Sequence, residues 1–147
     1  LENNVNSRGE YQVTDALQEM IRRGRRFKTF TVSSWYDCGH AESLLATNRV
    51  LLDEKEDLDG VYEVVDSVII HPVAIGENVS IVNSVVGPYA SIASDTVVEN
   101  SIISDSVIGS RTHISKVNLQ SSIVGDDTNL VGKHNSLNIG DSSSIEF

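Results

Sequence analysis

Histidine is the residue type in this chain best suited to general-base chemistry, because its ring titrates near neutral pH. Three of the four histidines lie after residue 60, at His71, His113 and His134. His134 is the best placed of these, in the loop Gly132-Lys133-His134-Asn135, beside a break in the repeats described below. A base there could take a proton from an amine or a hydroxyl group. Most loop histidines are only exposed polar residues, so residue type alone predicts no site.

A second candidate is Asp37, in the loop Trp35-Tyr36-Asp37-Cys38-Gly39. Its carboxylate follows a β-prone run and precedes a helix, a position that suits either a cleft or a helix cap. Cys38 is the only cysteine, so no disulfide can form within the chain, as expected for a reduced, cytoplasmic protein. Four arginines between residues 22 and 26 could suggest a phosphate site. A basic cluster at a helix C-terminus, however, usually complements the helix dipole.

Short helices and a strand are expected on either side of the Asp37 loop. Asp15 is a suitable N-cap and Gly24 a suitable C′ residue, which predicts a helix from about residue 16 to residue 23. The aromatic and β-branched run at 27–32 predicts a strand that ends in the loop. The apolar pattern that follows predicts a second helix from about residue 41 to residue 53.

From residue 68 onward the chain carries an internal repeat with a period of five or six residues, which is neither helical nor simple strand periodicity. A bulky aliphatic residue recurs at this spacing, at Ile70, Ile75, Ile81, Val86, Ile92, Val98, Ile103, Ile108, Ile114, Leu119, Val124 and Leu130. Two positions before each stands a small or β-branched residue: Val68, Val73, Val79, Ser84, Ala90, Thr96, Ser101, Ser106, Thr112, Val117, Ser122 and Thr128.

This repeat predicts one short strand and one turn per unit, with both marked side chains pointing inward. Every third aliphatic residue lies 16 or 17 positions further on, so three units close one triangular coil. The expected fold is a left-handed parallel β-helix of about four coils, mainly β, preceded by a small α/β segment. A β-sandwich would instead show longer alternating strands and turns every 8–12 residues or so.

Composition excludes several classes of partner. The formal net charge is −10, and residues 61–147 hold 3 Lys and Arg against 10 Asp and Glu. An acidic surface does not suit nucleic acid or an anionic membrane, since both require basic residues to offset phosphate charge. No apolar run approaches the length of a membrane span.

The segments around Asp37 resemble a known family. The run Gly9-Glu10-Tyr11-Gln12-Val13-Thr14-Asp15-Ala16-Leu17-Gln18, the Trp35–Gly39 loop and the helix with Asn48-Arg49 are similar to the closing segments of the catalytic domain of glucose-1-phosphate thymidylyltransferases. The same order occurs in related uridylyl-, adenylyl- and guanylyltransferases. Together with the repeats, the resemblance covers nearly the whole chain.

The resemblance implies a role for Asp37. In the family, the aspartate of this W-x-D-x-G motif binds the catalytic Mg²⁺ with a second aspartate from earlier in the domain. A hard divalent cation prefers carboxylate oxygens and neutralises phosphate charge during transfer. Glu10 and Asp15 lie in the other matched motif, where positioning the cleft wall and capping the helix are their expected roles. His40 departs from the threonine that many relatives carry there, and surface packing is its expected role.

The implied parent enzyme joins glucose 1-phosphate and dTTP to give dTDP-glucose and pyrophosphate. Its nucleotide is held by a Gly-rich loop of the type G-x-G-x-R-x-x-P, which this chain lacks. We therefore expect a piece of a longer protein that is inactive alone. Three regions are expected: a remnant of a Rossmann-like catalytic domain at 1–54, an acidic linker at 55–65, and a β-helix domain with a C-terminal cap at 66–147. The β-helix would serve homo-oligomerisation or regulation.

Two alternatives stay open. The repeat also occurs in hexapeptide acyltransferases, for which His134 would be the base, and a β-helix can act solely in assembly. The nucleobase, the sugar, the oligomer number and any allosteric ligand are not determined by these residues.

Overall fold

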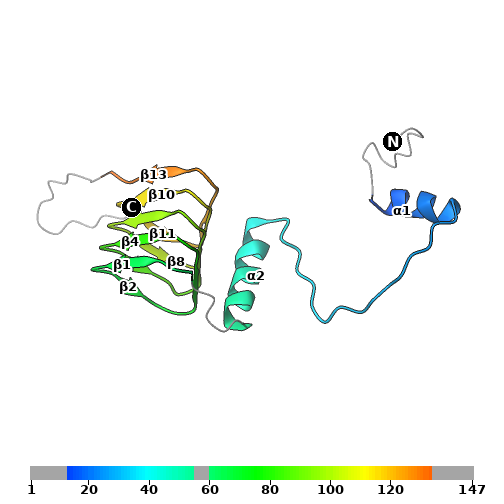
Figure 1. Ribbon diagram of the computed structural model, residues 1–147, viewed down its shortest axis with the longest axis horizontal. Coiled ribbons are helices and arrows are strands. Elements are labelled where there is room, and N and C mark those ends of the chain that lie inside the picture. Colours follow the sequence, from blue (N-terminus) through cyan, green and yellow to red (C-terminus); the bar gives the residue numbers. More distant parts are fainter. Residues whose placement is uncertain (1–12, 55–59, 134–147) are drawn as a thin grey trace, which may run out of the picture. The chain divides into compact units, whose positions relative to one another are not determined.

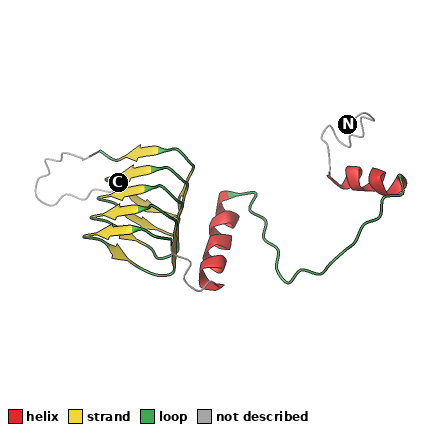
Figure 2. Cartoon of the chain, viewed as in Figure 1, coloured by secondary structure: helices red, strands yellow, loops and turns green. Residues whose placement is uncertain are grey.

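The computed structural model describes residues 13–54 and 60–133. It divides the chain into two compact units, Leu1–Trp35 and Tyr36–Phe147. The first unit contains helix α1 (Val13–Arg22) and the second contains helix α2 (Ala41–Glu54) followed by thirteen short strands. Figures 1 and 2 show the strands stacked as successive coils.

Helix α1 ends as its sequence predicts. Gly24 has a φ of 73°, and its N–H bonds to the carbonyl of Ile21 while the N–H of Arg25 bonds to that of Met20. This pair of bonds is a Schellman motif, which satisfies the last carbonyls of the helix. The helix starts at Val13, so Asp15 lies in its first turn and is not its N-cap. The predicted strand at 27–32 is wrong: these residues pair with no described strand.

The strands of the second unit are two or three residues long. They are β1 (Glu63–Val65), β2 (Val68–Ile69), β3 (Val73–Ile75), β4 (Ser80–Val82), β5 (Val85–Val86), β6 (Ala90–Ile92), β7 (Val97–Glu99), β8 (Ile102–Ser104), β9 (Val107–Ile108), β10 (His113–Ser115), β11 (Asn118–Gln120), β12 (Ile123–Val124) and β13 (Asn129–Val131).

Three parallel sheets form the faces of the solenoid. Their strand orders are β1-β4-β7-β10-β13, β2-β5-β8-β11 and β3-β6-β9-β12. Paired residues are 17 positions apart between β1 and β4 and 16 apart between β10 and β13. The predicted parallel β-helix of about four coils, with 16 or 17 residues in each coil, is confirmed.

A column of aliphatic side chains fills the interior. Ile81, Val86, Val98, Ile103 and Ile114 are 0% exposed, and Leu119, Val124 and Leu130 pack against this core while partly buried. Small residues complete each coil, and the inward hydroxyls among them all have partners: within the described residues no buried side-chain N or O atom lacks a hydrogen bond. The inward positions therefore follow the repeat.

The first coil differs from the prediction in two ways. Ile69, not Ile70, aligns with the buried Val86 and packs against the core, whereas Ile70 is 43% exposed. The spacing from Ile69 to Ile75 is thus six, one of the two spacings found in the later coils. Ser67 takes the inward place assigned to Val68. In addition, β1 pairs with β4, so the solenoid begins inside the segment 55–65 that was expected to be a linker.

Left-handed backbone conformations mark the corners. Among residues 60–133, the residue before an inward small or β-branched residue has φ between 46° and 60° at eleven positions, seven of them Asn or Asp. Asn and Asp tolerate this region better than other residues with a side chain, which explains their recurrence at this place in the repeat.

Candidate functional site

Asp37 belongs to the same compact unit as the solenoid, a unit that begins at Tyr36. Asp37 is exposed, and its Oδ1 accepts a hydrogen bond of 3.0 Å from the backbone N–H of Gly39. The Ser43 hydroxyl donates to the carbonyl of His40 and lies 3.4 Å from its N–H, at the start of α2. The Asp37 carboxylate thus helps shape the turn into α2 through Oδ1.

Asp37 fits Mg²⁺ as one ligand among several. A protein commonly gives Mg²⁺ one or two carboxylates, and substrate phosphates and water complete the octahedron. Among residues 13–54 and 60–133, no group of three or more His, Cys, Asp or Glu could hold a metal ion. A complete metal centre at Asp37 would need ligands from outside the described residues or from a substrate. The metal-binding role of Asp37 therefore stays a prediction.

The structure describes His113 but not His134. His134, the predicted base for acyl transfer, lies outside the described residues. His113 is on β10, where Nδ1 lies 3.1 Å from Asn129 Oδ1 and Nε2 lies 3.5 Å from Glu99 Oε2. A carboxylate can orient a histidine base, but both side chains of this pair are more than 40% exposed on the flat outer surface of their sheet. No sequence pattern indicates this pair, because the two residues are 14 positions apart.

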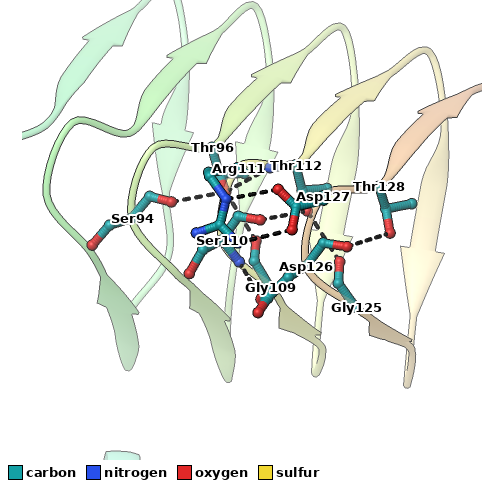
Figure 3. Close-up of polar contacts among 10 residues, drawn as sticks. All are labelled: Ser94, Thr96, Gly109, Ser110, Arg111, Thr112, Gly125, Asp126, Asp127 and Thr128. Atoms are coloured by element: carbon teal, nitrogen blue, oxygen red, sulfur yellow. Dashed lines mark hydrogen bonds and ion pairs between the residues drawn. The ribbon is translucent and has the colours of Figure 1, made fainter.

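A polar corner joins the sheet of β3, β6, β9 and β12 to the sheet of β1, β4, β7, β10 and β13 (Figure 3). Arg111 makes a bidentate pair with Asp127, at 2.7 and 2.8 Å, and this guanidinium holds the pKa of Asp127 below its usual value. Asp126 Oδ1 accepts the N–H of Ser110 at 2.7 Å. A Cβ at Gly109 would lie 2.5 Å from the Asp126 nitrogen, so this corner requires glycine. These contacts tie successive coils together.

Helix α2 is fixed to the solenoid by a cluster of side chains. Arg49 donates to Asp105 through Nε at 2.6 Å and through Nη2 at 2.5 Å. Asn48 donates to the Tyr89 carbonyl at 3.3 Å and accepts from the Ser91 hydroxyl at 2.6 Å. These residues come from α2, from β6 and from two corners, so the helix contacts successive coils.

The electrostatics of this contact favour the ionised pair. The Asp105 side chain is only 11% exposed, and its hydrogen bonds from Arg49 lower its pKa despite burial. Ser121 donates a further bond of 2.7 Å to Asp105. The Arg49 guanidinium also lies 5.8 Å from the centre of the Tyr89 ring, and the carboxylate of Asp53 raises the pKa of the Tyr89 hydroxyl.

Comparison with known proteins bears on the segment that contains Asp37 and α2. The chain is 34% identical to a glucose-1-phosphate thymidylyltransferase from Streptomyces griseus over 137 aligned positions, which cover 80% of this chain and 39% of that protein. It is 24% identical to another from Streptomyces antibioticus over 164 positions, covering 95% of this chain and 46% of that protein. The chain is similar to these two proteins over most of its length. No family model matches it, and no solved structure matches it significantly.

The chain spans less than half the length of these two relatives. The coverage of 80–95% of the chain extends beyond the solenoid repeats, which agrees with the resemblance found around Asp37. Within the described residues, neither helix is long and apolar enough to cross a bilayer.

Sequence reasoning missed the Arg49–Asp105 contact. The sequence marks Arg49 only as part of the family segment and does not single out Asp105. The two are 56 positions apart. A buried aspartate at a corner has no separate sequence signal, because corner positions favour Asn and Asp for backbone reasons alone.

Proposed function

We propose that this chain forms part of a sugar-1-phosphate nucleotidyltransferase that joins glucose 1-phosphate to dTTP and releases pyrophosphate. The observation that carries the proposal is the similarity to two proteins named glucose-1-phosphate thymidylyltransferase over 80–95% of the chain. The W-x-D-x-G loop and the helix after it lie in the part of the chain that resembles the family by motif. The nucleotide-binding residues would come from another part of the longer protein.

Within this function Asp37 would supply a carboxylate oxygen to Mg²⁺. The ion would neutralise charge on the reacting phosphates when bound. The exposure of Asp37 supports this role, and its hydrogen bond from Gly39 engages only one of the two carboxylate oxygens. The β-helix would support assembly of the enzyme or its regulation, and the cytoplasm would be its compartment.

The test is pyrophosphate release by the longer protein with glucose 1-phosphate, Mg²⁺ and each nucleoside triphosphate in turn. The expected result is activity with a preference for dTTP and, in Asp37→Asn, a fall of roughly a hundredfold or more, since metal stabilisation of the transition state is worth several kcal/mol. The Asp37→Asn variant should also need more Mg²⁺ for its half-maximal rate.

Asp95→Asn is the matched control. Asp95 is at a solenoid corner with a positive φ, as is Asn78 one coil earlier, so asparagine suits the position and activity should be unchanged. Lack of activity with every nucleotide, or full activity in Asp37→Asn, would contradict the proposal. Either result would favour acyl transfer or a purely structural role.

A further inference from the structure

One face of the solenoid is uncharged and open. The strands of the sheet β2-β5-β8-β11 contain no charged residue. Their outward side chains include Val68 and Ile102, which are 56% and 49% exposed, with Val85 between them. The face that contains β1 and β7 carries charged side chains such as Glu63 and Glu99. The face that contains β6 is contacted by α2 through Ser91.

Two shallow depressions lie along this open face. Their volumes are about 440 and 330 Å³, and both are lined by Asn100 and Ile102. The larger extends to Lys116 and the smaller to Asp66. The face is therefore a continuous, slightly hollowed strip that runs across the coils.

A column of corner residues borders the strip. It consists of Asp66, Asn83, Asn100 and Lys116, all with positive φ and all lining the depressions. The amide of Asn83 donates to Asn100 at 2.7 Å. The column thus has an acid at one end, a base at the other and two amides between them.

This column is complementary to the same column of a second chain that runs in the opposite order. A two-fold axis running along the strand direction between β5 and β8 would bring two such faces together with their coils in opposite order. Asp66 of one chain would then face Lys116 of the other, and Asn83 would face Asn100. In the outward column, Val85 would face Ile102. The same patch serves on both copies, as an isologous interface requires.

We propose that the face formed by β2, β5, β8 and β11 is a two-fold interface between two copies of this chain. The inference deepens the assembly role proposed above by naming its surface. A chain with a net charge of −10 repels its own copies through most of its surface, and the uncharged strip with oppositely charged ends is where two copies can approach closely. Burial of the valine and isoleucine side chains would drive the association.

The first test measures the mass of the whole 147-residue chain by sedimentation equilibrium. The wild type should form a species of twice the 16.0 kDa chain mass. Ile102→Glu should weaken dimerisation by about tenfold or more, because it places an unpaired carboxylate in an apolar contact. Val97→Glu is the matched control on a different sheet, and it should dimerise as the wild type does. Circular dichroism would confirm that both variants are folded.

The second test reverses the charges at the ends of the column. Asp66→Lys alone and Lys116→Asp alone should each weaken dimerisation, since each places like charges opposite one another. The double variant should recover it, because the reversed order is again self-complementary. Lysine and aspartate already occur at such positive-φ corners in this chain, so both changes suit the backbone.

A wild type that is monomeric throughout, an unaffected Ile102→Glu variant, or a double variant no better than the single ones would overturn the interface. Pyrophosphate release is not measured in these tests. Loss of the interface would therefore leave the proposed transferase reaction standing, and loss of the reaction would leave the interface standing.

Discussion

Single residues hold the coils together through two kinds of contact. Inward aliphatic side chains stack between coils, and inward hydroxyls bond to the backbone of the next coil. Ser84 N–H donates to Ser67 Oγ at 2.9 Å, and Ser101 N–H donates to Ser84 Oγ at 3.0 Å. Because these polar groups are satisfied inside the solenoid, serine and threonine can replace aliphatic residues there without the cost of an unpaired buried group.

Ile108 is one of the inward aliphatic residues and is 1% exposed. Ile108→Ala should lower the free energy of unfolding by about 2–5 kcal/mol, because it removes buried methyl groups and leaves a cavity in a narrow core. Urea denaturation of the whole chain measures the effect. Ile123→Ala is the control: Ile123 is on the neighbouring strand β12 and is 42% exposed, so its loss should cost much less. Equal losses at both positions would contradict the inward assignment.

At the scale of elements, the contact between α2 and the solenoid joins a helix to coils distant in sequence. The helix buries only Leu52 completely, so polar contacts make a large part of its attachment. The bidentate geometry of Arg49 and Asp105 fixes both the distance and the orientation of the helix. This contact therefore controls where the segment that leads into α2, including Asp37, emerges.

The element-scale prediction is a pH dependence of this attachment. Arg49 lowers the pKa of Asp105 in the folded chain, so the pair stabilises the fold fully above the ordinary pKa of an aspartate. That contribution is lost as the pH falls through the lowered, folded-state pKa. Wild type should thus be more stable than Arg49→Ala at neutral pH, with the difference shrinking in acid. Urea denaturation from neutral to acidic pH would measure it.

Arg111→Ala offers a comparison for the same series. Its pair with Asp127 is exposed on both sides, so its removal should change stability less, and it should leave α2 in place. Hydrogen exchange of the α2 amides distinguishes the two variants, since only Arg49→Ala should speed it. An α2 that exchanges equally in both would show that Arg49 does not hold the helix.

The solenoid was predictable from the sequence because the same pattern of aliphatic residues recurs in every coil. A spacing of five or six residues sustained over twelve units has no other simple physical explanation, and the buried positions of Ile81, Val98 and Ile114 follow it. The exception at Ile70 arose where two isoleucines adjoin and only strand pairing decides which one points inward. The failed strand at 27–32 shows the converse, since β-prone residues form a strand only when a partner strand is available.

The candidate site was less predictable for a related reason. Asp37 is recognisable only through a motif, and its metal role depends on donors that this chain's described residues do not bring to it. The contact of Arg49 with Asp105, and that of His113 with Glu99, depend on coil geometry and on long sequence separations. Local patterns carry no information about such pairs until the register of the coils is known.

At the scale of the whole molecule, the compact units divide the chain at Trp35 and Tyr36, earlier than the expected boundary near residue 54. Helix α2 resembles the end of a catalytic domain by motif, yet it is attached to the β-helix by side-chain contacts. Because α2 directly follows the Asp37 loop, its attachment to the solenoid would fix where that loop lies relative to the coils. The β-helix would then orient the Asp37 loop.

This arrangement predicts the behaviour of two shortened chains. A chain starting at Tyr36 should unfold in one cooperative transition close to that of the solenoid in the whole chain, because it retains the compact unit. A chain starting at Gly60 should have a lower melting temperature, since it loses Leu52, the Arg49–Asp105 pair and the cover over Ser91. Thermal unfolding followed by circular dichroism would measure both. Equal melting temperatures would mean that α2 lies on the solenoid without stabilising it, and its link to the Asp37 loop would then lack an energetic basis.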